Sequence, residues 1–406
     1  MPPSEDREPI TVVIERFVAG GEGLARHPDG RVVFVRGGIP GDRAEVRIVD
    51  ERRDWLRADL LSVESPSPDR IVPSCVHRLN GCGGCDWAEV EDGAQRVHKA
   101  AIVAEALRRT ARIELTPDIG QSVSRTGYRT SIRVVGADDG SPAYRRSGST
   151  ELVAARRCEI AEARLRSVLD QIALTPGLEV GLRTSVATGA VSARWDDRSG
   201  SVDGLPPDAV IGSEARIVER VSGKDLAVST GSFFQSGPEA AEILVASIAE
   251  LAPEIGSCAH LLDAYAGVGL FAATLGAQAQ QVTVVESSRA AVADARVNLA
   301  ARGSEVSFAR CDVGDWRPAG QKTPVDVVIA DPARTGLGRP GVGAVTRARP
   351  ELLILVSCDP VAMARDTALL GAAGYHLESA VVHDLFPGTH HVEVVSRFVP
   401  AGTLGP

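Results

Sequence analysis

Lysine is rare in this chain of 406 residues: it occurs only at Lys99, Lys224 and Lys322, so arginine supplies nearly all of the 44 basic side chains. Acidic residues number 53, which gives a formal net charge of −9. This balance excludes a protein that coats nucleic acid through bulk positive charge, but it leaves room for a local basic groove. Arginine suits bidentate phosphate and base contacts, although a bias toward arginine also follows from genomic composition alone.

Long apolar runs are also missing. No stretch approaches the roughly 20 apolar residues of a membrane span. The first residues, MPPSEDREP, lack the basic start and the apolar segment of a signal peptide. Hydrophobic residues nevertheless make up 44% of the chain, which excludes a disordered protein. We therefore expect a cytoplasmic protein without membrane contact, and its length suggests two or three domains.

Cysteine is sparse too: the chain holds 7, an odd number that excludes a disulfide scaffold at this length. In a reducing compartment, clustered cysteines more often bind metal or perform chemistry. The pattern Cys75-x6-Cys82-x2-Cys85, with Cys158 far downstream, suits either zinc or an iron–sulfur cluster. Three clustered cysteines and one remote cysteine favour a 4Fe–4S cluster, while His77 offers an alternative ligand set.

Hydrophobic periodicity predicts an α/β protein of several parts. Alternating β-branched and polar residues at 10–63 predict a small antiparallel barrel, which a linker at 64–70 ends. A mixed region follows, with helices at about 94–112 and 161–172. From about residue 232, apolar runs alternate with helices, which predicts a doubly wound, mostly parallel sheet. The expected strands are HLLDAY (260–265), QVTVVE (281–286), VSFARCD (306–312), VDVVIADP (325–332) and ELLILVSC (351–358), with two more in 375–399.

A glycine loop, DAYAGVGLF at 263–271, follows the first of these strands and opens a helix, where open α/β sheets bind ligands. Gly267 lets the backbone approach an adenosine, without the third glycine of a dinucleotide cradle. Glu286, at the end of the second strand, suits the ribose hydroxyls; Asp312, after the third, suits the adenine amino group; and Asp331 ends the fourth. The ordered set favours S-adenosylmethionine, because acidic side chains suit its cationic sulfonium. The alternative is that Glu286 and Asp312 only cap or solvate strand ends.

Two candidate reactive side chains lie near the C-terminus. Cys358, in SCDP, follows an apolar strand at the edge expected to carry the cofactor, where a thiolate could react. A cysteine after such a strand is otherwise a small buried hydrophobe. Glu393, in HHVEVV, stands among strand-forming residues, where it serves as an acid or base or else faces outward. The residues alone leave these alternatives open.

A resemblance covers almost the whole chain. Its motifs are GGEGLAR, VFV and PGD in the barrel, the cysteine pattern, GSFFQ at 231–235, DAYAGVG, VVE, ADPAR, SCDP and HHVEVV. They resemble the RNA uracil-5-methyltransferase family, in the iron–sulfur branch with an N-terminal TRAM domain. Two positions depart from the family: Leu270 stands where asparagine is frequent, and DPAR at 331–334 replaces DPPR. These departures affect detailed cofactor contacts and not the reaction type.

The resemblance implies S-adenosylmethionine-dependent methylation of uridine C5 in structured RNA, rRNA or tRNA, through a covalent adduct with uracil C6. It implies that Cys358 is the nucleophile and Glu393 the general base. It also implies an OB-like TRAM barrel over 1–64, a central α+β iron–sulfur domain over 65–230, and a Rossmann-like methyltransferase domain over 231–406. The residues that it assigns to the cofactor and target-base site are Gln235, Tyr265, Glu286, Asp331 and, as a further cofactor contact, Asp312.

RNA contacts are expected at two places. The barrel would hold RNA by shape and stacking, with Arg31, Phe34 and Arg36 as candidates, although core packing is the more common task of such a phenylalanine. Residues 125–157 carry 7 arginines against 3 acidic residues, which suits phosphates or a solvated charged face. Two other functions stay open: methylation of another substrate, and an RNA-binding or iron-sensing module with an inert methyltransferase fold. We expect a monomer.

Overall fold

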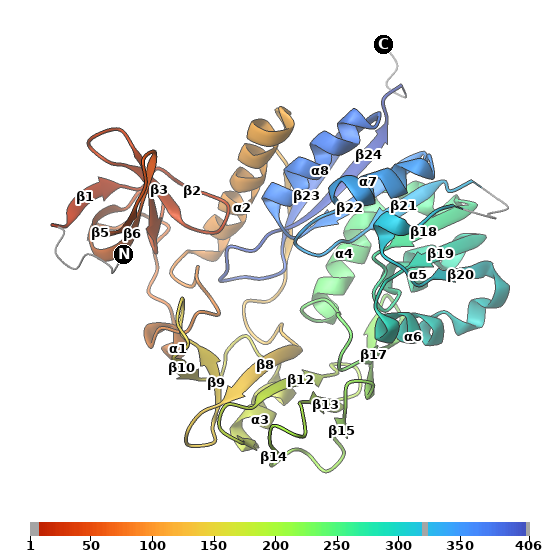
Figure 1. The fold of residues 1–406 in the computed structure, drawn as a ribbon, viewed down its shortest axis with the longest axis horizontal. Coiled ribbons are helices and arrows are strands. Elements are labelled where there is room, and N and C mark those ends of the chain that lie inside the picture. The colour runs from red at the N-terminus through yellow and green to blue at the C-terminus, as the bar shows by residue number, and fades with distance from the viewer. Residues whose placement is uncertain (1–7, 319–323, 403–406) are drawn as a thin grey trace.

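The computed structural model describes residues 8–318 and 324–402. The opening residues on which the signal-peptide prediction rests lie mainly outside this range. Figure 1 shows three units: an N-terminal sheet, a central sheet at the bottom of the view, and a C-terminal sheet covered by helices. The domain boundaries at 64 and 230 stay predictions. None of the described helices is long and apolar enough to cross a membrane.

The N-terminal unit is a six-stranded sheet in the order β1-β5-β6-β4-β3-β2. Its pairs are antiparallel except β4 and β6, which run parallel with Val32 opposite Trp55. Val33 and Val35 are buried in the core, whereas Phe34 is half-buried on the other face, its ring centroid 5.9 Å from that of Trp55. The expectation that Phe34 packs in this core is wrong, because successive strand residues face opposite sides. The strands are β1 (Ile10–Val13), β2 (Arg16–Phe17), β3 (Gly23–Arg26), β4 (Val32–Arg36), β5 (Arg43–Glu51) and β6 (Trp55–Ser65).

The two arginines expected to accompany Phe34 both contact acids of the same unit. Arg31 donates to Asp29 and to Glu51, each at 2.8 Å. Arg36 lies 3.6 Å from Asp59, and its side chain is 55% exposed. Arg36 is therefore the more accessible of the two to a ligand.

The central unit holds a second six-stranded sheet, in the order β10-β9-β8-β12-β13-β15. The helix expected near 161–172 is present as α3 (Ala163–Gln171). It starts there because the Glu162 side chain accepts from two backbone N–H groups of its first turn. Leu165 and Leu169 then pack against the sheet. The strands are β8 (Ser131–Gly136), β9 (Pro142–Arg145), β10 (Leu152–Ala154), β12 (Glu179–Thr184), β13 (Val191–Arg194) and β15 (Val210–Ile211), beside a small pair, β11 (Ala173–Leu174) and β14 (Val202–Asp203).

The C-terminal unit is built on an eight-stranded sheet in the order β20-β19-β18-β21-β22-β24-β23-β7. Strands β18 to β22 run parallel, and β24 and β23 continue the sheet antiparallel. Each apolar run expected as a strand is one, so the prediction of a doubly wound, mostly parallel α/β sheet is confirmed. The bounds are β18 (His260–Ala264), β19 (Gln281–Val285), β20 (Val306–Ala309), β21 (Val327–Ala330), β22 (Leu352–Ser357), β23 (Tyr375–Asp384) and β24 (Glu393–Pro400).

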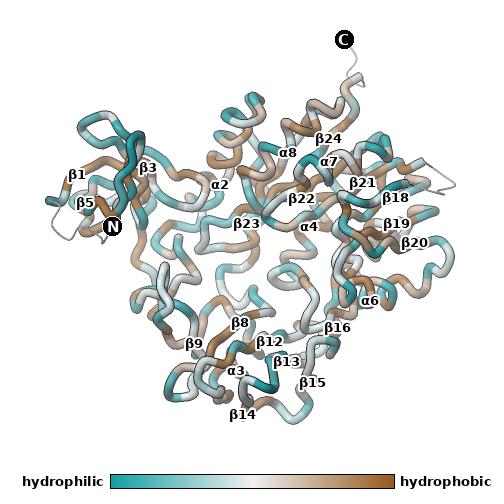
Figure 2. Tube along the Cα trace, in the orientation of Figure 1, coloured by the Kyte–Doolittle hydropathy of each residue, from teal (hydrophilic) through white to brown (hydrophobic). Residues whose placement is uncertain are grey.

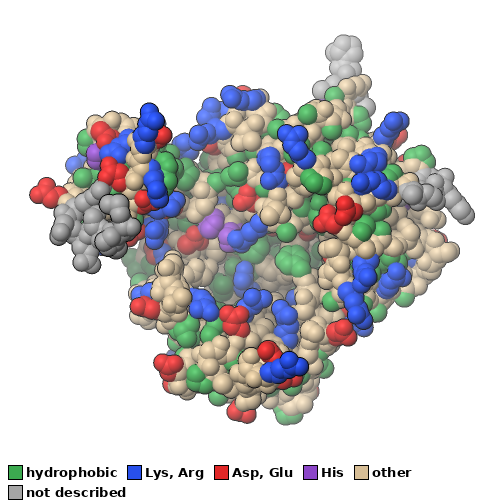
Figure 3. All heavy atoms as spheres, in the orientation of Figure 1, with side chains coloured by type: hydrophobic (Ala, Val, Ile, Leu, Met, Phe, Trp, Pro, Cys, Tyr) green, Lys and Arg blue, Asp and Glu red, His purple; other side chains and the backbone are tan. Residues whose placement is uncertain are grey.

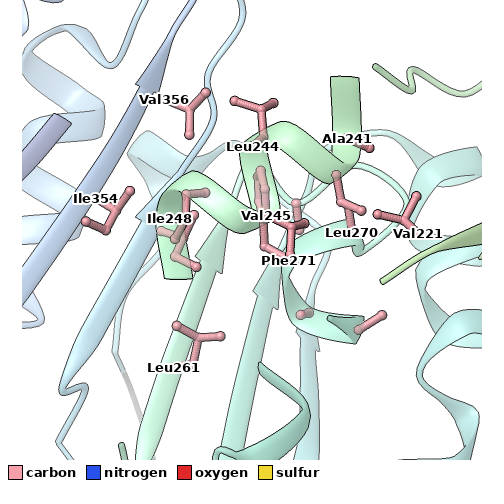
Figure 4. Packing of buried hydrophobic residues seen from close by; sticks show 14 of the residues in the cluster. Val221, Ala241, Leu244, Val245, Ile248, Leu261, Leu270, Phe271, Ile354 and Val356 are labelled. Atoms are coloured by element: carbon pink, nitrogen blue, oxygen red, sulfur yellow. The ribbon is translucent and has the colours of Figure 1, made fainter. Parts of the chain in front are cut away.

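Helices cover both faces of this sheet, since successive residues of its strands face two separate buried layers. Leu261 and Ile354 join the layer of α4, α5 and α6, whereas Leu262 and Leu353 join the layer of α2, α7 and α8. Figure 4 shows α4 above the sheet, with Ile248 between Leu261 and Ile354 in the view. Figure 2 shows the brown, hydrophobic lengths of chain recurring in the sheet and its helices. The helices are α2 (Asp92–Ala106), α4 (Pro238–Leu251), α5 (Leu270–Ala273), α6 (Arg289–Asn298), α7 (Gly338–Arg347) and α8 (Pro360–Ala372).

Three parts of the C-terminal unit come from residues that precede 231 in the chain: a strand, a helix and a hairpin. Strand β7 (Asp118–Ser122) pairs in parallel with β23, with Ile119 opposite Val382. Helix α2 continues into a π-helical turn at Leu107–Ala111 and packs in the second layer. The hairpin of β16 (Arg216–Val221) and β17 (Lys224–Ser229) joins the first layer through Val221, which Figure 4 shows beside Leu270. The unit therefore uses residues well outside 231–406.

A buried ion pair ties α2 to the end of β23. Lys99 Nζ donates to Asp384 Oδ1 at 2.6 Å, and the two side chains are 0% and 2% exposed. Lys99 also donates to the Phe386 carbonyl at 3.3 Å and lies 6.0 Å from the Trp87 ring centroid. Burial lowers the pKa of Lys99, and the charge of Asp384 opposes that shift. Lys99, one of the few lysines of the chain, is therefore held in a buried ion pair.

We predict that Lys99→Met lowers the free energy of unfolding by about 3–5 kcal/mol, because it leaves Asp384 buried without its partner. Urea denaturation followed by circular dichroism measures this loss. The matched control is Lys224→Met, at an exposed hairpin position, which should change stability by less than about 0.5 kcal/mol. Equal, small changes in both variants would contradict the prediction.

Candidate active site

The glycine loop forms a tight turn between β18 and α5. Three of its residues have left-handed backbone angles: Tyr265 (φ 60°), Gly267 (φ 55°) and Gly269 (φ 82°). At Gly269 a side chain would also crowd α6, since a Cβ there would lie 3.3 Å from that of Ala295. The φ of Tyr265 is costly for a residue with a side chain, so the surrounding packing must hold it. The packing around the loop therefore holds it in one conformation at the carboxyl edge of the sheet.

Asp263, the residue before this turn in β18, is a site candidate that the sequence interpretation missed. It is fully buried, and its Oδ2 accepts from the Ala272 backbone at 2.9 Å. Its Oδ1 has no hydrogen-bond partner among the described residues. Burial, with the charges of Asp331 and Glu286, raises the pKa of Asp263 to about 8. A lone acid within the apolar run HLLDAY was the signal that could have revealed it.

Glu286 and Asp312 follow their strands as expected, but they differ in surroundings. Glu286 Oε2 accepts from the Gly267 backbone at 3.0 Å, so it contacts the glycine loop directly. Asp312 is exposed and caps a short 3₁₀ turn, accepting from the Gly314 backbone at 2.8 Å. Both carboxylates therefore make a bond of the capping kind, since Glu286 Oε1 accepts from the Ser288 backbone at 2.7 Å, but Glu286 also joins the turn on which a cofactor would rest.

A small cavity of about 40 Å³ brings the next expected residues together. Gln235 and Asp331 face each other there, with Gln235 Nε2 donating to Asp331 Oδ2 at 3.1 Å. Phe233 stands at the cavity with 71% of its surface exposed. Leu270, the departure from the family pattern, lines the same cavity and packs in the core. The cavity is lined by Phe233, Phe234, Gln235, Tyr265, Ala266, Gly267, Val268, Leu270, Phe271 and Asp331.

Sheet register sets Cys358 against Glu393. Strands β22 and β24 pair antiparallel with Ser357 opposite Val394, so the next position along β22, Cys358, comes to Glu393. Burial and the Glu393 and Asp331 carboxyls raise the pKa of Cys358 to about 12, whereas Arg334 opposes the shift. Burial and the nearby Asp331 raise the pKa of Glu393 well above its usual range. Burial likewise raises the pKa of Asp331, against the hydrogen bond from Gln235.

Cys358 also borders a second cavity, of about 70 Å³. Arg334, retained from the DPAR motif, lies there with its Nη2 3.0 Å from His391 Nε2. Burial lowers the pKa of His391 to about 4, so near neutral pH this ring is uncharged and accepts from the guanidinium. Sequence reasoning missed His391, although it stands two residues before Glu393. The site therefore has a fixed cation beside the thiol.

The four cysteines singled out by spacing line one pocket of about 510 Å³. All seven cysteines are free thiols, as expected. Burial and the adjacent cysteines raise the pKa of Cys85 to about 12, and burial also raises the pKa of Cys82. His77 borders the same pocket, and its Nε2 lacks a partner among the described residues. Within residues 8–318 and 324–402, no group of three or more His, Cys, Asp or Glu side chains is arranged to hold a metal ion.

The arginine-rich stretch at 125–157 surrounds this pocket. Arg125 pairs with Asp92, Arg145 with Glu179 and Arg146 with Glu151. Arg129 and Arg133 line the pocket as well. Figure 3 shows this face of the molecule hollowed between the three units, with Lys and Arg side chains around the hollow. Whether the stretch binds phosphates stays a prediction.

Comparisons with known proteins identify the family. The model of the TRAM domain matches residues 3–61, and the model of tRNA (Uracil-5-)-methyltransferase matches residues 218–397. An uncharacterized RNA methyltransferase of Streptomyces avermitilis is 33% identical, over 97% of this chain and 99% of its own. The chain belongs to the RNA uracil-5-methyltransferase family. The N-terminal unit of this methyltransferase is accordingly a TRAM β half-barrel.

Two further relatives of the methyltransferase have named substrates. The 23S rRNA (uracil(1939)-C(5))-methyltransferase of Shewanella halifaxensis is 27% identical, with 93% of each chain covered. The crystal structure of Pyrococcus abyssi tRNA (uracil-54, C5)-methyltransferase in complex with S-adenosyl-L-homocysteine shares the fold, with a TM-score of 0.74, 23% identity, and 96% of this chain and 99% of that chain covered. The protein is an S-adenosylmethionine-dependent enzyme that methylates C5 of uracil in RNA.

We predict that alkylation of Cys358 by iodoacetamide rises about tenfold per pH unit from pH 7 to pH 10, without levelling off. The thiolate is the reactive form, and its fraction grows with pH until the pKa is reached, here about 12. Mass spectrometry of the Cys358 peptide measures the rate, and N-acetylcysteine, which levels off near an ordinary thiol pKa of about 8.5, is the control. If the alkylation rate of Cys358 levelled off below pH 9, the raised pKa of this thiol would be contradicted.

Proposed function

We propose that this methyltransferase acts through a covalent bond between Cys358 and C6 of the target uracil, with Glu393 as the base. One observation carries the proposal: the register of β22 and β24 sets this thiol and this carboxyl side by side, next to the cavity of Gln235 and Asp331. The resemblance of SCDP and HHVEVV to the family's motifs supports the same roles.

The chemistry follows from the weak nucleophilicity of uracil C5. The Cys358 thiolate adds to C6, and the electron pair of the C5–C6 double bond moves onto C5 and O4. C5 then forms the new carbon–carbon bond to the methyl group that S-adenosylmethionine supplies; the S–CH3 bond of the sulfonium breaks, its electron pair stays on sulfur, and S-adenosylhomocysteine leaves. Glu393 takes the proton from C5, and the C6–Sγ bond breaks to return the thiolate and release 5-methyluracil. A carboxyl with a raised pKa is a stronger base than an ordinary glutamate once it is ionised.

The surrounding residues would orient the two reactants. Arg334 stabilises negative charge on the Cys358 sulfur before it adds, since it opposes the rise of the pKa of that thiol. Asp331, held by Gln235, faces the polar edge of the uracil ring. Gly267, Glu286 and Asp312 hold the adenosine part of the cofactor, where the glycine turn lets backbone approach it. Leu270 is apolar and packs in the core, so it offers the cofactor no side-chain hydrogen bond.

A structured RNA fits the surface around the site. The target base must leave its stack to reach the half-buried Cys358 thiol, so the RNA must be flipped or remodelled locally. A groove between the TRAM half-barrel and α2 is lined by aromatic and basic side chains. Phe34 and Trp55 offer rings for stacking there, and Arg16, Arg26 and Arg109 offer charges for phosphates. The groove opens toward Val361, three residues after Cys358.

We predict that Cys358→Ala abolishes methyl transfer and also prevents the denaturant-stable adduct that RNA containing 5-fluorouridine forms. Glu393→Gln should still form a covalent adduct with ordinary RNA but release it at least about 100-fold more slowly, because the C5 proton has no base. Gel shifts under denaturing conditions and transfer of tritiated methyl groups measure the two steps. The control is Cys258→Ala, a buried cysteine outside the site, which should retain both activities.

Two RNA substrates distinguish the named possibilities: a 23S rRNA fragment that contains uridine 1939, and a tRNA transcript that contains uridine 54. Methylation of one of them by the wild-type enzyme assigns the substrate class. If Cys358→Ala methylates that RNA at the wild-type rate, the covalent mechanism is wrong.

We further propose that Cys75, Cys82, Cys85 and Cys158 hold a 4Fe–4S cluster, in which each thiolate ligates one iron. The donor chemistry supports this, since four thiols line one pocket of about 510 Å³, although in the described residues they are not gathered closely enough to hold a metal ion. The raised pKa values of Cys82 and Cys85 reflect burial and the crowding of neighbouring thiols, which a cluster's iron would relieve. The cluster would brace this part of the central unit. Zinc is the alternative metal that the same four thiols would bind.

We predict about four iron and four sulfide per chain after anaerobic purification, with an absorption band near 400 nm that is lost in Cys158→Ser. Inductively coupled plasma spectrometry and a sulfide assay measure the content. Cys311→Ser, away from the pocket, should keep the full content. One zinc per chain without sulfide would establish the alternative.

A further inference from the structure

One loop borders both the cysteine pocket and the cavity of Cys358. It joins β23 to β24 and spans residues 385–392. Pro387 and Gly388 line the pocket of the four cysteines, whereas His390 and His391 line the cavity of Cys358. Glu393 follows as the first residue of β24. Any shift of this loop therefore changes both sites.

The first half of the loop is fixed by buried backbone contacts. Trp87 donates its backbone N–H to the Gly388 carbonyl at 2.8 Å. Gly388 donates in turn to the Gln95 side chain at 2.7 Å, in a buried bond. Lys99 holds Asp384 and the Phe386 carbonyl just before it. These contacts tie the loop to α2 and to the segment that follows Cys85.

The second half is held by Asp86, the residue directly after Cys85. Asp86 Oδ2 lies 2.5 Å from His390 Nδ1, and Asp86 Oδ1 accepts from the His390 backbone at 3.2 Å. One carboxylate thus fixes both the ring and the main chain of His390. From the other side the TRAM half-barrel confines the same residue, because a Cβ at Gly21 would lie 2.6 Å from the Cβ of His390.

The contact continues to the reacting thiol. The ring centroids of His390 and His391 are 4.2 Å apart, and His391 lies 3.0 Å from Arg334, whose charge acts on Cys358. The chain of contacts therefore runs from Cys85 through Asp86, His390 and His391 to Arg334. Asp86 adjoins Cys85 in the chain, and each later step is a packed or hydrogen-bonded pair.

We propose that Asp86 is a positioning residue for methyl transfer, which couples the state of the cysteine pocket to the geometry around Cys358 through His390. The four thiols, when they hold a metal, would fix the turn that carries Asp86, and Asp86 fixes the wall of the cavity that Cys358 borders. The inference rests on the proposed roles of Cys358 and of the four cysteines. It adds a function for the cysteine pocket, which is to align the reacting groups through the Asp86 carboxylate.

The test compares Asp86→Ala, His390→Ala and the double variant. Each single change should lower kcat about tenfold, as expected for misplaced reacting groups, with KM for S-adenosylmethionine and the iron content unchanged. The double variant should be no slower than either single one, since both remove the same contact. The matched control is Asp69→Ala, which breaks another aspartate–histidine pair, with His98 at 2.9 Å, and should keep the wild-type kcat.

A second measurement does not depend on turnover. In the wild type, stripping iron with a chelator should change the rate of Cys358 alkylation by at least about threefold, and in Asp86→Ala it should change nothing. If Asp86→Ala does not fold, His390→Ala carries the same test. Wild-type kcat in both single variants, loss of iron in step with activity, or additive losses in the double variant would each overturn the proposal. If Cys358→Ala remains active while the alkylation coupling persists, the covalent mechanism fails and the positioning role stands.

Discussion

The ion pair of Lys99 and Asp384 is the contact on which the arrangement of the active site depends. A buried charge is tolerated only with its partner in place, so this pair fixes the distance between α2 and the end of β23. The loop that begins at Asp384 reaches the cysteine pocket and ends at Glu393. Glu393, the cysteine pocket and the TRAM half-barrel are therefore positioned relative to one internal salt bridge.

The groups proposed to react lie in an environment that disfavours charge. Asp331 makes ionisation of the buried Glu393 more costly, and both carboxyls make ionisation of the Cys358 thiol more costly. Arg334 supplies positive charge beside them. Such a balance suits the proposed reaction, in which charge passes from sulfur to the uracil ring and then to a carboxylate, because Arg334 offsets only part of the cost of the thiolate before the substrate arrives.

Local patterns in the sequence predicted most of the methyltransferase sheet. The apolar runs from HLLDAY to ELLILVSC became β18 to β22, because a parallel strand covered on both faces must be apolar throughout. The joint assignment of Cys358 and Glu393 came from the resemblance to the family and not from local patterns, which left the task of each residue open. The roles of α2 and β7 could not be predicted, since their partners lie more than two hundred residues away in sequence. Asp86 and His390 are 304 residues apart, and no local pattern links them. The expectation for Phe34 was wrong because the alternation of residues along a strand separates two faces but does not show which face is buried.

The parallel pairing of β7 with β23 has a consequence for biosynthesis. Residues 118–122 leave the ribosome on the order of ten seconds or more before residues 375–384 exist, at bacterial rates of elongation. During that interval the edge of β7 is unpaired, and the apolar side of α2 at Val103 and Leu107 has no sheet to cover it. The nascent chain must therefore keep its first third from associating with other chains until its last strands are made. Because β7 and α2 precede residue 231, no single cleavage of the chain separates the methyltransferase unit from the rest. A fragment that begins at residue 231 would lack this strand of the sheet and this helix that covers it.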